Sequence, residues 1–152
     1  MKTLADVEDM AEIVQRLSAL TAGNQRRWGK MTVDEMVCHL SDAFRVALKE
    51  KHPQPVSNWF SRSVTKWAAL QLPMRWPHGV STVPECDAKV GGTRPAELAR
   101  DLSELHLLLV RFSKRPRDFE YADHPIFGKM TEAEWQRWGY LHMDHHLRQF
   151  GA

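Results

Sequence analysis

Apolar side chains recur at spacings of three and four residues along most of this chain, and that period is typical of α-helices with one buried face. The first segment with this pattern predicts a helix from about residue 3 to about residue 21. Its expected apolar face consists of Leu4, Val7, Ala11, Val14 and Leu17. The sequence TAGN should end the helix, because Gly23 suits a helix C-terminus.

Three later segments repeat the helical pattern. The second predicted helix spans about residues 33–50, and the apolar residues on one side of it are Val33, Met36, Val37, Leu40, Phe44 and Ala47. A helix that follows Pro95 has the seam Leu98, Leu102, Leu105, Leu109 and Phe112, and KRPRD ends it. The last helix is predicted from Thr131 to about Phe150.

Two of these helices begin with similar sequences, WGKMTVDEM and FGKMTEAEW. Each contains a capping box, in which a threonine side chain accepts from the backbone of a glutamate that reaches back to the threonine. The pairs are Thr32 with Glu35 and Thr131 with Glu134. The likeness indicates two similar helix starts.

The region from 51 to 93 interrupts the pattern with prolines and glycines and holds one short candidate helix, SNWFSRSVTKWAALQL, at 57–72. Its remainder reads as a long ordered loop. With four principal helices and almost no strand signal, the sequence predicts an all-α fold. We expect a single domain over residues 1–152, an antiparallel four-helix bundle with the short helix and the loop between its second and third helices.

Composition narrows the classes of protein. A net charge of +2 and the lack of basic runs interleaved with aromatics argue against nucleic-acid binding. The longest apolar runs, such as LHLLLV, are too short to span a bilayer, and the N-terminus does not resemble a signal peptide. Only two cysteines are present, Cys38 and Cys86, outside any CxxC motif. We therefore expect a cytoplasmic protein that binds neither membrane nor nucleic acid.

The last helix carries three histidines in the sequence GYLHMDHHLRQFG, where its apolar face changes from indole to imidazole. His142 and His146 are four residues apart, so their β-carbons should lie about 5–6 Å apart and their rings can converge on one ion. His142 with His145 is a weaker pair. A third ligand must come from another helix, and His39 is placed on the edge of a core face, as is His106. Three neutral imidazoles with an open position suit a divalent transition metal.

Structural roles compete with this interpretation. A single histidine at the edge of a core is more often satisfied by a carbonyl or a carboxylate than by a metal. Met143 follows His142, where the metalloprotease motif needs a glutamate, so that motif is excluded. We expect no role for His52, His78 and His106, and we expect Cys38 to be a packed thiol.

Two segments of the chain, HPIFGKMTEAEWQRWGYLHMDHHLRQFG and WGKMTVDEMVCHLSDAFRVAL, resemble the DinB-like (DinB/YfiT) superfamily of metal-binding four-helix bundles, in a branch of uncharacterised function. The resemblance covers most of the chain and is weakest from 51 to 93. Members carry one histidine on the second helix, matched here by His39, and an H-x-x-H-H-x-x-Q pattern on the last main helix. The resemblance implies the ligands His39, His142 and His146, with His145 and Gln149 beside them.

The resemblance also implies chemistry. Some members of the superfamily are low-molecular-weight-thiol transferases or a thiol-dependent isomerase, so a bound divalent ion, zinc or nickel, could activate a water or thiol here. We expect a thiol S-transferase or a small hydrolase acting on a small molecule. Glu35, Asp42 and Asp144 are candidates for a general base or for an outer partner of the ligands, but each is better interpreted as a solvated carboxylate on a helix surface.

The alternative is a non-catalytic bundle that binds a metal or ligand, which a fourth ligand from Glu35 or Asp42 would favour. Related bundles commonly pair, and the aromatics Trp59, Phe60 and Trp67 are expected on an exposed face, so we also expect a homodimer.

Overall fold

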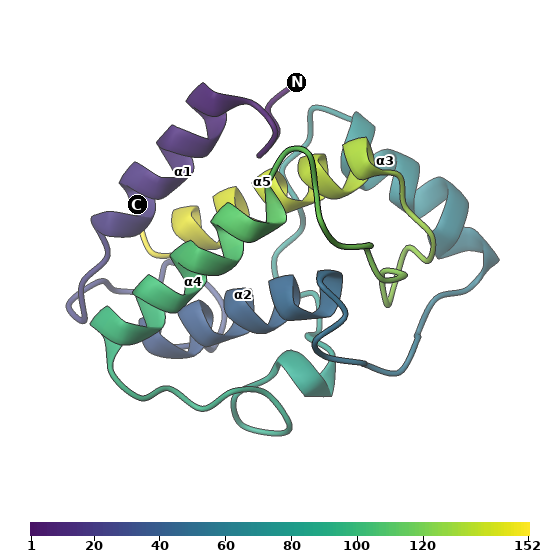
Figure 1. Ribbon diagram of the computed structural model, residues 1–152. Coiled ribbons are helices and arrows are strands. Elements are labelled where there is room, and N and C mark those ends of the chain that lie inside the picture. Colours follow the sequence, from purple (N-terminus) through teal and green to yellow (C-terminus); the bar gives the residue numbers. More distant parts are fainter.

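The computed structural model describes residues 1–152, and its regular secondary structure consists of helices (Figure 1). Its α-helices are α1 (Val7–Ser18), α2 (Val33–Ala47), α3 (Lys66–Gln71), α4 (Leu98–Phe112) and α5 (Glu132–Gln149). A π-helical turn, η1 (Ser61–Thr65), precedes α3, and a 3-10 turn, η2 (Pro84–Cys86), lies in the loop before α4. The only extended pairing is an isolated bridge between His124 and Gly128. The all-α prediction is confirmed.

Both predicted capping boxes start their helices. Thr32 Oγ1 accepts from the backbone N–H of Glu35 at 3.2 Å, and the Glu35 carboxylate accepts from Thr32 at 2.9 Å. At the start of α5 the corresponding distances between Thr131 and Glu134 are 3.2 and 2.7 Å. These bonds satisfy backbone donors that have no partner within the helix. They fix where α2, which carries His39, and α5, which carries His142, His145 and His146, begin.

The apolar face predicted for the first helix is wrong in part. The helix starts later than expected, because Asp6 caps it by accepting from the backbone of Glu8 and Asp9. Leu4 is buried in the chain before the helix, while Val7 is 83% exposed. The buried face of α1 carries Leu17, as predicted, together with Ile13, which was not part of the predicted face.

Packing of α2 against α4 and α5 forms the centre of the molecule, and α1 covers α4 and α5 on another side (Figure 1). Phe44 of α2 lies edge-on to Phe112 of α4, with ring centroids 4.9 Å apart, and to Trp138 of α5 at 5.8 Å. Trp135 is completely buried beside them. This aromatic core holds α2 and α5 together next to the histidines.

The short helix between α2 and α4 leaves aromatic side chains uncovered. Trp59, Phe60 and Trp67 are exposed over more than half of their surface. That exposure is the feature on which the expected homodimer rests, and the homodimer stays a prediction. None of the helices has the length and apolar character needed to cross a membrane.

A buried carboxylate ties the loop before α4 to α2. Asp42 is 0% exposed and accepts from Thr93, from the backbone N–H at 2.6 Å and from Oγ1 at 2.7 Å. It also pairs with Lys51 at 2.7 Å and Arg45 at 2.8 Å. Burial raises the pKa of Asp42, but the bonds from Lys51, Thr93 and Arg45 outweigh it and lower the pKa overall. Asp42 is therefore a structural anion rather than a solvated carboxylate or a free base.

Replacing Asp42 with Ala should lower the free energy of unfolding by about 3 kcal/mol, because two cations and Thr93 lose a buried partner. Urea denaturation of both proteins measures the difference. Glu104→Ala is the matched control, since the Glu104 side chain also pairs with Arg45 but is 48% exposed, and its loss should cost about 1 kcal/mol or less. Equal losses in the two variants would contradict the assignment.

Candidate metal centre

Three imidazoles from two helices meet at the packed face of α2 and α5. His39 comes from α2, and His142 and His146 come from successive turns of α5. One ring nitrogen from each lies within 4.8 Å of the others, and the Nε2 atoms of His39 and His142 are 3.1 Å apart. Two nitrogens on a tetrahedral zinc ion are about 3.3 Å apart, given Zn–N bonds of about 2.0–2.1 Å. The cluster could therefore hold a divalent metal ion.

Burial keeps these imidazoles in the form that binds metals. His39 is 7% exposed and His142 9% exposed, while His146 is half-buried. Burial lowers the pKa of His39 below its usual range. It lowers the pKa of His142 and His146 further, helped by the neighbouring histidines. All three rings are therefore neutral near pH 7, as a metal ligand must be.

Hydrogen bonds fix which nitrogen of two rings faces the cluster. His39 Nδ1 lies 3.1 Å from the carbonyl of Cys86, so Nδ1–H donates and the Nε2 lone pair points to His142. His146 Nδ1–H donates to Gln149 Oε1 at 2.8 Å, and Gln149 Nε2 donates to the carbonyl of Trp28 at 2.8 Å. Such outer partners orient the ligands of metal sites. Gln149, expected beside the ligands, orients His146, and the Cys86 carbonyl that accepts from His39 is the kind of structural partner expected for a histidine at the edge of a core.

The contact between His39 and His142 bears on whether a cation fits between the rings. Because the Nδ1 atom of His39 carries the proton, its Nε2 is a bare acceptor, and it faces His142 Nε2 at 3.1 Å. His142 can donate its Nε2–H to this lone pair, or both nitrogens can face one cation. His142 Nδ1 is buried with no partner, so packing against Trp138, 4.8 Å away between ring centroids, holds this ring. The residues present fit a metal ion.

Aromatic rings surround the outer side of the cluster. His145 lies outside the trio, with its ring 5.1 Å from that of His146, and burial lowers its pKa to about 4. Trp28 packs edge-on to His145 at 5.7 Å and stacks on His78 at 4.0 Å. His78, for which no role was expected, is therefore part of the surroundings of the site. Its position depends on the loop, which no sequence pattern specified.

The histidines left over do not join the cluster. His52 and His106 lie elsewhere, as expected. His124 had no predicted role and is a core residue, because its Nδ1 accepts from the backbone of Ile126 and Phe127, each at 3.2 Å. Burial lowers the pKa of His124 to about 3, so it too is neutral.

The carboxylates considered from the sequence do not complete the cluster, which contains histidines only. Glu35 caps α2 and pairs with Lys89, and Asp144 pairs with Arg16 and Arg148 at 2.9 Å each. Together with the buried Asp42, each is occupied by cations, so the expectation of a free general base is not met. Three ligands leave coordination positions open.

The two cysteines are not activated thiols. Cys38 is buried with its Sγ 3.7 Å from Asp101, and Cys86 is buried as well. Burial raises the pKa of both to about 12. Cys38 is the packed thiol expected from the sequence.

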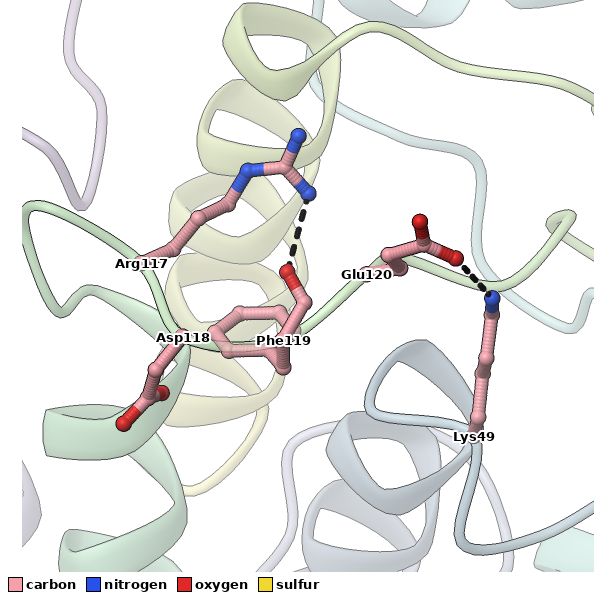
Figure 2. Close-up of a pocket in the computed structure, with 5 residues that line it drawn as sticks. All are labelled: Lys49, Arg117, Asp118, Phe119 and Glu120. Atoms are coloured by element: carbon pink, nitrogen blue, oxygen red, sulfur yellow. Dashed lines mark hydrogen bonds and ion pairs between the residues drawn. The ribbon is translucent and has the colours of Figure 1, made fainter.

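A separate hollow of about 570 Å³ lies at the end of α2 against the chain that follows α4 (Figure 2). Figure 2 shows Glu120 paired with Lys49 at 3.0 Å, and Arg117 donating to the carbonyl of Phe119 at 3.1 Å. Its fifth residue, Asp118, pairs with Lys114. The hollow contains no histidine or cysteine, and its charges are already satisfied.

Comparisons place the chain in one family. Residues 2–152 match the family described as "Protein of unknown function (DUF1569)", which covers almost the entire chain. No curated protein and no solved structure matches it.

The metal-free protein should lose stability as the pH falls below about 6.5. Five histidines have lowered pKa values: His39, His124, His142, His145 and His146. The unfolded chain then takes up protons before the folded chain does, so the stabilisation, complete above 6.5, is lost toward about pH 3. Urea denaturation with a chelator present, from about pH 7.5 to about pH 5, measures this loss. An unchanged free energy of unfolding across that range would contradict it, because paired carboxylates such as Asp42 titrate lower.

Proposed function

We propose that this chain, which belongs to the DUF1569 family, binds a divalent transition metal through His39, His142 and His146. The observation that carries the proposal is the meeting of three neutral imidazoles, two with Nε2 fixed toward the cluster by hydrogen bonds from Nδ1. Imidazole nitrogen suits zinc and nickel, which are the proposed ions. Metal analysis of the purified protein tests the proposal directly.

The proposal includes membership of the DinB-like superfamily and its antiparallel four-helix bundle. Supporting it are four long helices, α1, α2, α4 and α5, with a histidine on the second and the H-x-x-H-H-x-x-Q pattern on the last. The meeting of His39 with His142 and His146, and the exclusion of His145, agree with the ligands that this resemblance implies.

Open coordination positions favour an enzyme over a structural metal site. When bound, a divalent metal would lower the pKa of a water or thiol ligand. The chain's own residues keep the ligand nitrogens neutral and orient them. The rings of Trp28 and Trp76 shield the outer side of the cluster. We propose a thiol S-transferase or small-molecule hydrolase, and a screen of the metal-loaded protein with thiols and electrophiles tests for that activity.

A non-catalytic metal-binding bundle is the second candidate. The observation that favours it is the burial of His39 and His142, which are less than 10% exposed. Structural metal sites are closed to solvent, whereas catalytic ones keep a position for substrate. Binding of a thiol to the metal-loaded protein would exclude the closed site.

Replacing His39, His142 or His146 with Ala should abolish stoichiometric metal binding, because each removes one of three ligands. We expect His142→Ala to have the largest effect. His145→Ala should retain the metal, since the pair of His142 and His146 survives. Metal content by mass spectrometry, with folding checked by circular dichroism, measures these effects. Retention in His146→Ala with loss in His145→Ala would show that the ligands are wrongly assigned.

Gly29→Ala should weaken metal affinity about 10- to 100-fold, because a Cβ there would lie 2.5 Å from Gln149 Nε2 and displace the partner of His146. Gly79→Ala is the matched control: both glycines have φ +79°, but nothing lies within 4 Å of a Cβ at Gly79. The two variants therefore share the backbone strain and differ only in the contact with Gln149. Competition with a chromophoric chelator gives both dissociation constants. Equal affinities would mean that Gln149 does not support the site.

A further inference from the structure

A second pocket, of about 320 Å³, lies against the side of α5 that faces away from the histidine cluster and shares Trp76 with the surroundings of that cluster. The α5 residues that line it recur at helical spacing and include Arg137, Leu141, Asp144 and Arg148. At 100° per residue, His142 and His146 lie about 140–160° around the helix axis from this stripe, and His145 lies between the two positions. The opposite wall is the segment 72–76.

The indole of Trp76 is shared by the pocket and the metal centre. It lines the pocket, and its ring centroid lies 6.0 Å from that of His142 and 6.3 Å from that of His145. Its Nε1–H donates to the carbonyl of Ala69 at 2.9 Å, which fixes the orientation of the ring. The pocket and the cluster are therefore separated by one side chain.

Basic side chains predominate in the lining of this pocket. The charged lining residues are Lys2, Arg75, Arg137, Arg148 and a single acid, Asp144. Lys2 pairs with Glu12, and Arg148 pairs with Asp144 at 2.9 Å. Arg75 and Arg137 form no ion pair. Two arginines of the pocket are thus without a directly paired carboxylate, and Asp9 and Asp144 act on Arg137 only from a distance.

Arg137 is held in place by backbone carbonyls instead of a carboxylate. Its Nε–H donates to the carbonyl of Leu70 at 3.2 Å, and Nη1 donates to that of Lys2 at 2.7 Å. A guanidinium has five N–H donors, so about three remain for a ligand. A planar, anchored guanidinium matches the two oxygens of a carboxylate. Burial lowers the pKa of Arg137, which is half-buried and lacks a counter-ion.

We infer that this pocket binds the carboxylate of a small-molecule ligand through Arg137 and Arg75, and that the other end of the ligand reaches the histidine cluster past Trp76. The inference rests on the proposed metal function and names the class of substrate that the site accepts. The volume of the pocket lies within the range of small-molecule sites.

Paired thiols test the inference on the cobalt-loaded protein. The probes are 3-mercaptopropionate and 6-mercaptohexanoate, each beside its neutral alcohol, 3-mercaptopropanol or 6-mercaptohexanol, with thiolate–cobalt absorption as the readout. At least one acid should bind about tenfold more tightly than its alcohol. Arg137→Gln should remove that preference and leave the affinity for the alcohols unchanged. Arg75→Gln should reduce the preference, and it breaks no hydrogen bond to the backbone.

Arg100→Gln is the matched control, because Arg100 is an exposed arginine on α4 outside the pocket. Equal binding of acids and alcohols in every variant would overturn the carboxylate pocket and leave the metal site intact. If no thiol binds, the proposed thiol chemistry fails. Calorimetry with hexanoate and the metal-free protein then tests carboxylate binding in the pocket independently of the metal. Hexanoate affinity that falls about tenfold in Arg137→Gln supports the pocket, and affinity that does not change overturns it.

Discussion

Three imidazoles that each bring a ring nitrogen within 4.8 Å of the others in a packed interface cannot all take up a second proton, because burial and mutual repulsion both disfavour the charged form. This constraint makes the cluster of His39, His142 and His146 a set of neutral nitrogen ligands instead of three solvated cations. Because the rings are uncharged, hydrogen bonds and packing set the orientation of each ring. The aromatic core between α2 and α5 holds the rings at this distance.

The aim of the rings depends on segments far away in the chain. The Cys86 carbonyl that orients His39 belongs to η2, and Lys51 holds that turn by donating to the carbonyl of Glu85 at 3.0 Å while pairing with the buried Asp42. The buried carboxylate of Asp42 therefore supports, through Lys51, the turn whose carbonyl orients His39. On the other side, the carbonyl of Trp28 holds Gln149. Neither support is close in sequence to the ring that it positions.

The helix α5 combines three chemistries on two sides: its indoles are followed by imidazoles on one side, and its arginines lie on the other. Trp135 and Trp138 lie in the aromatic core, His142 and His146 form the candidate metal face, and Arg137 and Arg148 line the basic pocket. A metal that activates a thiol or water and an arginine that holds a carboxylate would then act on two ends of one small molecule. Trp76 packs near His142 and also lines the basic pocket.

The sequence alone predicted the helices and the pair His142 and His146, because periodicity, capping boxes and a spacing of four residues act through local geometry, whereas the full set with His39 came from the family resemblance. It misjudged the apolar face of α1, since the cap at Asp6 starts that helix beyond Leu4. Tertiary structure alone decided the burial of Asp42, the stacking of His78 on Trp28 and the use of the Cys86 carbonyl. These contacts join residues tens of positions apart through irregular loops. A carbonyl is chemically alike at every position, so only the folded chain selects the one that faces His39.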